Sequence, residues 1–373
     1  MTKPLPPRAK LLMRFFEALN QTRARYCVMN NYEDLPLVIP SDVDIAVDPA
    51  FFAGLDQMIS AFSAQEQVPV VQKIWHGNRK CAYILGTEKP RAFLQLDFFV
   101  EFSIKGCPNL IASEDLLADR RAFGRFFIPR PDVERVFTVM RRLFKDDWTE
   151  RHTARVQELT ARISGAAWLP ARYAWLQQSI DLANAGDVAT LSRQRAEGWV
   201  RLKQSAGAGL SSLGWLRNLV WQSRRGVARL RDETGNLSLV LGTIEGEADA
   251  LAALETVFHR RLTIDENWLE KQGGGLKLAA RIKLLKQRKG LVLVRLGENT
   301  PRARKLAAKL GRFGLVDQAI MGKDAVDAPK LRTSVVVVAD GADMIEAILA
   351  SQIAKTRIAL ARRGTQTSGR SHG

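Results

Sequence analysis

Hydrophobic and polar positions alternate with several different periods along this chain of 373 residues. In the first 110 residues, apolar side chains at helical spacing predict helices, and short apolar runs with a period of two predict strands. The expected helices cover residues 7–21 and 51–64, and the expected strands cover residues 25–29, 42–48, 68–75, 81–85 and 92–101. This pattern predicts a compact α+β domain over residues 1–110.

The next stretch changes to a mainly helical pattern. Residues 113–163 have helical spacing, interrupted at the Pro-rich segment 128–131, and residues 168–232 continue as Arg-rich helices. We therefore expect a basic helical linker domain over residues 111–232.

Strands and helices alternate again from residue 233. An apolar run that meets a glycine turn and then a helical pattern occurs three times, with strands at 237–242, 290–296 and 334–338 and helices at 248–261, 301–312 and 343–360. Strand–glycine–helix units in series favour a parallel sheet. We expect an α/β domain over residues 233–361 and a disordered tail over 362–373. The fold class is thus α/β and α+β multidomain, with a mixed sheet first and a parallel sheet last.

The net charge of +17 is distributed unevenly. Residues 1–150 hold 20 Lys and Arg against 19 Asp and Glu, which leaves 36 against 20 for residues 151–373. A basic half of this kind attracts phosphorylated substrates, an anionic membrane face or nucleic acid. The plainer interpretation is that its Arg and Trp residues, such as Trp199, Trp215 and Trp221, belong to packed helices with one solvated face.

Several classes of protein are disfavoured. No run reaches the roughly 18 apolar residues that cross a bilayer, and the N-terminal stretch is broken by Pro and Arg, unlike a secretory signal. The three cysteines have neither a disulfide pattern nor the spacing of a zinc site. The sequence predicts a cytoplasmic protein.

The most informative motif is Asp42-Val43-Asp44-Ile45. Acidic residues are poor strand formers, and two on one face of a strand repel each other unless a cation lies between them. Residues i and i+2 of a strand share a face about 6.6 Å apart, so both carboxylates can converge on Mg²⁺ or Mn²⁺. A third acid, Asp97, lies in another expected strand, and Leu96 and Phe98 face the opposite side.

Other interpretations of these residues are open. The acid pair is also compatible with an acidic turn or a calcium loop, although Val47 stands where an EF-hand needs glycine. Asp97 alone could be an edge-strand charge. His76 could contact a substrate, but a histidine in a surface turn is the simpler expectation.

The chain resembles the polymerase-beta-type nucleotidyltransferase superfamily. The matching pattern is Val28-Met29-Asn30-Asn31, ten further residues, Asp42-Val43-Asp44-Ile45 and then Leu96-Asp97-Phe98. The resemblance implies that Asp42, Asp44 and Asp97 bind the catalytic metal ions and that Asn30 and Asn31 contact the nucleoside triphosphate. Asn30-Asn31 replaces the usual Gly-Ser pair, whose small side chains let backbone N–H groups approach phosphate.

The last part resembles a thymidylate-kinase-like domain, which is fused to such nucleotidyltransferase domains in bacterial polysaccharide gene clusters. The turn Gly242–Ala250 follows a strand and opens a helix, as a phosphate loop does. A working loop needs Gly, Lys and Ser/Thr where this chain has Glu247, Ala248 and Asp249. The resemblance therefore implies a kinase-like fold without kinase activity.

These observations predict a nucleotidyltransferase that moves a nucleotidyl group from a nucleoside triphosphate to an unknown acceptor, which the resemblance places in surface-polysaccharide assembly. The rival hypothesis is a catalytically inactive scaffold whose basic half docks on a membrane face, a glycosyltransferase or an acidic polymer. A transferase that modifies nucleic acid is a third hypothesis, supported only by the basic half.

Overall fold

A computed structural model describes most of the chain in two compact units. It describes residues 5–77, 79–87, 92–104, 107–206, 216, 219–220, 222–224, 235–257, 261–272, 276–289, 291–296, 300–323 and 333–368. The first unit comprises residues 1–55, 76–81 and 95–226, and the second comprises residues 56–75, 82–94 and 227–373. The expected domain limits at residues 110, 232 and 361 stay a prediction. Among the described residues, no helix is long and apolar enough to cross a membrane.

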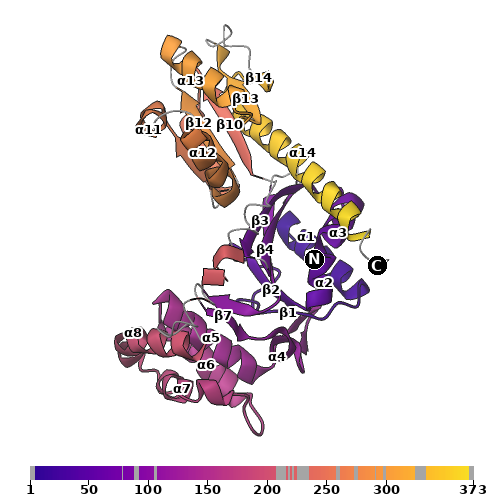
Figure 1. Ribbon diagram of the computed structural model, residues 1–373. Coiled ribbons are helices and arrows are strands. Elements are labelled where there is room, and N and C mark those ends of the chain that lie inside the picture. Colours follow the sequence, from indigo (N-terminus) through magenta and orange to yellow (C-terminus); the bar gives the residue numbers. More distant parts are fainter. Residues whose placement is uncertain are drawn as a thin grey trace. The chain divides into compact units, whose positions relative to one another are not determined.

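The expected mixed sheet of the N-terminal part is present (Figure 1). Its strands, in spatial order, are β1 (Tyr26–Val28), β2 (Val43–Val47), β5 (Ala92–Phe99), β4 (Lys80–Thr87) and β3 (Val70–Gly77). Strand β2 pairs antiparallel with β1 and parallel with β5. The sheet is preceded by helix α1 (Pro7–Gln21), as predicted. The expected helix at 51–64 is divided at Gly54 into α2 (Pro49–Ala53) and α3 (Leu55–Gln65).

Strand β2 is buried along its whole length, although its alternation of apolar and acidic residues is typical of a half-buried strand. On the next strand, Phe98 packs edge-on against Phe15 of α1 with ring centroids 5.9 Å apart. Ala46 belongs instead to a hydrophobic core that includes Val136 and Phe137 of helix α5 (Pro131–Lys145). Because alternate residues of a strand face opposite sides, one face packs against α1 and the other faces α5. A polar side chain on the α5 face is therefore shielded from bulk water.

The helical pattern expected over residues 113–163 is wrong for residues 121–128, which form two strands, and the sequence pattern did not predict the two strands before residue 113. The chain forms a hairpin of β6 (Phe102–Ile104) and β7 (Cys107–Ile111), then the short helix α4 (Ser113–Leu117). A second hairpin joins β8 (Arg121–Phe123) to β9 (Phe126–Ile128). Gly124, in its turn, has a φ of 57°, which glycine adopts without steric cost. The helices α5 and α6 (Glu150–Ala161) then follow as expected.

The helices that follow in the first unit, where we expected basic helices, are packed elements with one solvated face, although α7 itself contains no Lys or Arg. They are η1 (Ala171–Tyr173), α7 (Leu176–Asn184) and α8 (Val188–Ser205). In α8, Trp199 packs against Phe144 with ring centroids 5.5 Å apart, and Arg195 donates to the backbone carbonyls of Leu143 and Phe144. The plainer interpretation thus holds for this part, while Trp215 and Trp221 lie outside the described residues.

The second unit contains the expected parallel sheet. Its five strands, in spatial order, are β11 (Arg261–Ile264), β12 (Leu291–Leu296), β10 (Asn236–Leu241), β13 (Gln318–Met321) and β14 (Ser334–Val337). All four pairings are parallel.

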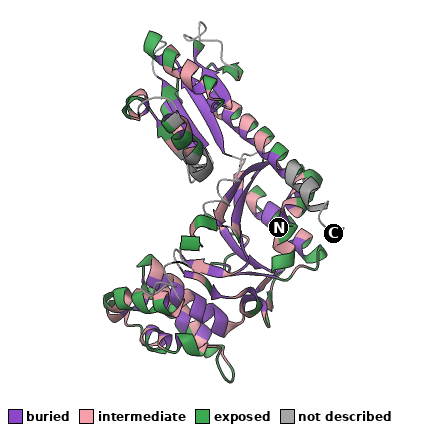
Figure 2. Ribbon diagram, in the orientation of Figure 1, coloured by how far each residue is buried: buried purple, intermediate pink, exposed green. Residues whose placement is uncertain are grey.

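Five helices accompany this sheet among the described residues. They are α10 (Glu247–Val257), α11 (Glu266–Lys271), α12 (Leu276–Lys289), α13 (Pro301–Arg312) and α14 (Gly341–Ser368). Figure 2 shows the inner strands buried between helices with exposed outer faces.

The sequence pattern did not predict β11, α11, α12 and β13, and two of the expected helices have other limits in the structure. The expected helix 248–261 ends earlier, because β11 begins at Arg261. Helix α14 continues to Ser368, past residue 361, where we expected a disordered tail to begin, and residues 369–373 lie outside the described part of the chain.

Candidate functional site

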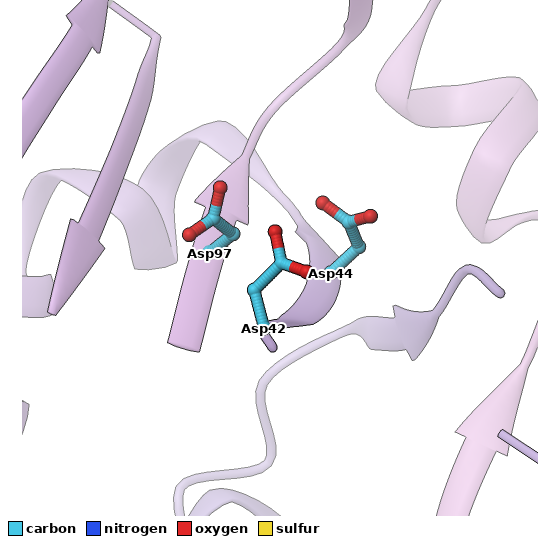
Figure 3. A group of neighbouring side chains, drawn as sticks. All are labelled: Asp42, Asp44 and Asp97. Carbon is cyan, nitrogen blue, oxygen red and sulfur yellow. The ribbon is translucent and has the colours of Figure 1, made fainter. Parts of the chain in front are cut away.

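The three acidic residues singled out by the sequence lie together. Asp44 of β2 and Asp97 of β5 are register partners in adjacent parallel strands. Asp42 comes immediately before β2, which begins at Val43, so it is not the strand residue that we expected. One carboxylate oxygen from each of the three lies within 4.8 Å of the others. Figure 3 shows the three carboxylates projecting to the same side of these two strands.

The donor set of this site fits a hard divalent cation. Asp44 and Asp97 are only 6% and 4% exposed, and Asp42 is half-buried. Three carboxylates offer only oxygen ligands, which Mg²⁺ and Mn²⁺ prefer. Two buried acids on neighbouring strands repel each other, and a divalent ion between them would relieve that repulsion.

Side-chain cations also surround the acidic group. Arg141 of α5 donates to Asp44 Oδ2 at 2.8 Å. The Nζ atom of Lys80 lies 3.9 Å from Asp44 Oδ1 and 3.7 Å from Asp97 Oδ2. His76 Nε2 is 3.6 Å from Asp97 Oδ2, and its side chain is 15% exposed, so it is not the surface-turn histidine that we expected.

The two buried acids differ in their acidity. Burial would raise the pKa of Asp44, but Lys80 and Arg141 outweigh it and hold the pKa below its usual range. Burial also raises the pKa of Asp97, to about 6, with Lys80 opposing the shift and the neighbouring carboxylates of Asp44 and Asp42 adding to it. The difference arises because the arginine contacts Asp44 and not Asp97.

Asn30 connects the acidic group to its surroundings. Its amide nitrogen donates to Asp44 Oδ2 at 3.0 Å, and its amide oxygen accepts from Arg141 at 2.7 Å. Asn31 has a φ of 50°, a left-handed conformation that asparagine tolerates. The segment after them consists of turns and bends rather than a helix. It therefore presents no helix N-terminus to a phosphate, and nucleotide binding by the two asparagines stays a prediction.

Sequence reasoning missed a basic pocket next to the acidic group. A cavity of about 380 Å³ is lined by Asn30, Asn31, Glu33, Glu134, Phe137, Thr138, Arg141, Arg142, Lys145, Arg151, His152, Ala154, Arg155 and Glu158. Its cations lie on both sides of residue 150, where we divided the chain to count charge, so neither net charge indicated that they gather at the end of α5 and the start of α6. A usable signal was the spacing of Arg141 and Lys145, and of Arg151 and Arg155, which places each pair on one helical face.

The glycine turn of the second unit lies at the carboxyl end of β10, the central strand. Gly242 and Gly246 have φ values of 79° and 69°. Glu247 begins α10, as expected of an acid at a helix N-terminus, and accepts two hydrogen bonds from Arg295, at 2.6 and 2.8 Å. The glycine turn expected after the strand at 290–296 falls on residues 297–299, which lie outside the described residues.

Comparison with known proteins found no matching family model, no similar curated protein and no similar solved structure.

Proposed function

We propose that this chain is a metal-dependent nucleotidyltransferase. The observation that carries the proposal is the meeting of Asp42, Asp44 and Asp97, whose ligand atoms lie within 4.8 Å of one another. Asp97 is more than 50 positions away from Asp42 and Asp44 in sequence, and the parallel pairing of β2 with β5 brings it to them. The basic pocket beside them supplies the second requirement, a place for a polyphosphate.

The proposed reaction is an in-line displacement at the α-phosphorus of a nucleoside triphosphate. A bond forms between an acceptor oxygen and the α-phosphorus, the bond from the α-phosphorus to the β-phosphate oxygen breaks, and pyrophosphate leaves. The acceptor loses its proton to a nearby base. By resemblance, the acceptor belongs to surface-polysaccharide assembly.

Each acidic residue has a distinct part in the proposal. Asp42 and Asp44 hold Mg²⁺ or Mn²⁺ against the triphosphate, and Asp97 completes the cation site on the acceptor side. A divalent cation there supplies charge neutralisation for the entering and leaving oxygens. Lys80 lies within 4 Å of both Asp44 and Asp97 and balances part of the acidic charge before any cation binds.

We assign residues 233–361 to a kinase-like fold without kinase activity. Support comes from its parallel sheet and from the glycine turn that joins the central strand β10 to α10. In open parallel sheets, ligands bind beyond the carboxyl ends of the strands at the point where the strand order reverses. At this place Glu247 and Arg295 form a bidentate pair, so a carboxylate is present where a kinase needs a cation for phosphate.

One observation favours the rival hypothesis of an inactive scaffold. Arg141 already neutralises Asp44 and contacts Asn30, so a cation of the chain itself occupies part of the acidic site. In that case the acidic group would be a structural ion-pair network, and the basic half would dock on a membrane face, a glycosyltransferase or an acidic polymer.

Isothermal calorimetry with ATP, CTP, GTP and UTP in the presence of Mg²⁺ separates the two functions. The enzyme hypothesis predicts binding of at least one nucleotide that Mg²⁺ strengthens, and this strengthening should be lost in Asp42→Asn. The scaffold hypothesis predicts no binding of any of the four. Asp34→Asn is the matched control, because Asp34 is an exposed acid in the nearby turn and outside the acidic group.

A transfer assay with nucleotide labelled at the α-phosphate completes the test. Extracts of surface polysaccharide and its lipid-linked precursors supply the candidate acceptors. Label should be transferred by the wild-type protein and by Asp34→Asn, and not by Asp44→Asn. Equal transfer by Asp44→Asn and the wild type would reject the assignment.

A further inference from the structure

The basic pocket differs from the acidic group in what it can bind. It is formed by the turn after β1 and by facing surfaces of α5 and α6, all within the first unit. Five cationic side chains line it, against the three carboxylates of Glu33, Glu134 and Glu158. Its volume, about 380 Å³, is within the usual range for small-molecule sites.

One arginine of the pocket already forms ion pairs with all three of its acidic residues. Arg155 forms ion pairs with Glu33 at 2.9 Å, with Glu134 at 2.6 Å and with Glu158 at 2.6 Å. Its guanidinium also contacts the hydroxyl of Tyr32. These contacts fix Arg155 as part of the pocket wall and leave the other cations in excess.

Two cations of the pocket, Lys145 and Arg151, differ from the other three in their partners. Among the described residues, neither Lys145 nor Arg151 forms a salt bridge, and both are exposed at the pocket. Burial and the nearby Arg141 and Arg142 lower the pKa of Lys145. Cations that repel one another in this way are stabilised when an anion binds between them.

His152 does not add to the positive charge of the pocket. Its Nε2 atom is 2.9 Å from Arg142, a cation that disfavours a second positive charge on the ring. Burial and Arg142 lower the pKa of His152 accordingly. Arg142 is held in turn by Asp147 at 2.8 Å.

The pocket and the acidic group share two residues. Asn30 and Arg141 line the pocket, and both also contact Asp44 Oδ2, at 3.0 and 2.8 Å. A bound anion that fills the pocket can therefore also contact a divalent cation held by the three carboxylates of the acidic group. A chain of linked phosphates has this shape and charge, and guanidinium and ammonium groups are its usual partners.

We propose that the pocket is the subsite for the β- and γ-phosphates of the nucleotide, with Lys145 and Arg151 as its phosphate-binding residues. This inference rests on the proposed transferase function. After transfer, the same residues hold the pyrophosphate product, and its release empties the pocket.

Inorganic pyrophosphate in the presence of EDTA is the probe for the pocket alone. Calorimetry should show binding by the full chain that weakens at least tenfold in Lys145→Ala and in Arg151→Ala. Arg193→Ala is the matched control, since Arg193 is an exposed arginine of α8 outside the pocket, and it should bind as the wild type does. Lys145→Gln and Arg151→Gln repeat the test with side chains of similar length, and circular dichroism checks that each variant is folded. No binding by the wild type, or equal binding by the folded variants, overturns the proposal.

Competition identifies the source of the phosphate. Pyrophosphate should displace a nucleoside triphosphate that is bound with Mg²⁺, because both occupy the pocket. If nucleotide binding is unaffected by saturating pyrophosphate, the pocket receives another phosphorylated compound and its assignment to the nucleotide is wrong.

A failure of the pocket can be distinguished from a failure of the transferase function. Asp42→Asn removes a residue of the acidic group but none of the pocket lining. It should therefore abolish transfer and keep metal-free pyrophosphate binding. Loss of transfer together with intact pyrophosphate binding supports the pocket, whatever reaction the acidic group performs.

Discussion

Asp44 and Asp97 are register partners on the parallel strands β2 and β5, yet their surroundings shift their pKa values in opposite directions. Arg141 and Lys80 lower the pKa of Asp44 despite its burial. Burial dominates at Asp97 and raises its pKa to about 6. The acidic group thus contains one carboxylate that the protein stabilises as an anion and one whose charge the protein disfavours.

The first prediction is that removing these two charges has opposite effects on stability without metal. Asp44→Asn should lower the free energy of unfolding by about 1–3 kcal/mol, because it leaves Arg141 without its carboxylate. Asp97→Asn should raise it by about 1–3 kcal/mol at pH 7.5, because it removes a buried charge with a raised pKa. Urea denaturation in EDTA measures both values. A decrease of similar size in both variants would contradict this prediction.

The sequence predicted this site because the information was local. The alternation in Asp42-Val43-Asp44-Ile45 and in Leu96-Asp97-Phe98 specifies which side each residue faces. Two strands that share a buried face then bring the acids together. The partners Lys80 and Arg141 could not be predicted in this way, because they approach from distant elements through pairing and helix packing that no local period encodes.

The same reasoning explains the errors in the fold. The hairpin β8–β9 lies in the apolar, Arg-containing segment 120–128, which a helical pattern fits almost as well. Only its packing, such as Phe126 against Phe16 of α1 with ring centroids 4.8 Å apart, selects the strands. In the second unit, β13 has only four residues and is defined by its pairing with β10 and β14 rather than by its own sequence.

The second prediction concerns Arg141, which competes with a metal ion for Asp44 and also lines the pocket. Replacing it by leucine removes the competing cation, so we expect Mn²⁺ to bind about three- to tenfold more tightly. The same variant should bind pyrophosphate more weakly, because the pocket loses a guanidinium. Electron paramagnetic resonance of Mn²⁺ and calorimetry with pyrophosphate measure the two affinities.

The control for this variant is Arg142→Leu, which removes a neighbouring pocket cation that is paired with Asp147 rather than with Asp44. It should not increase the affinity for Mn²⁺. Equal Mn²⁺ affinities in Arg141→Leu and the wild type would show that Arg141 does not compete with the metal.

The third prediction tests the glycine turn of the second unit. A Cβ atom added to Gly341 would lie 2.5 Å from the carbonyl oxygen of Gly246, a backbone atom that cannot turn away. Gly341→Ala should therefore destabilise this unit by about 1–3 kcal/mol and lower its thermal midpoint. Gly77→Ala serves as the control, since nothing lies within 4 Å of a Cβ there. An unchanged midpoint in Gly341→Ala would mean that β14 and the turn do not pack as described.

The last prediction is a pH dependence of metal binding. The metal-free protein binds a proton at Asp97 with a pKa of about 6, whereas an ordinary aspartate has a pKa of 3.8. This group therefore stabilises the metal-free fold most at low pH, and that contribution is lost as the pH rises through about 6. A divalent ion needs the ionised carboxylate, so its affinity should be full above pH 7 and should fall about tenfold for each pH unit below 6. Mn²⁺ titrations from pH 5 to pH 8 measure the slope. In Asp97→Asn the dependence around pH 6 should disappear along with most of the affinity, whereas the same slope in that variant would assign the proton to another group.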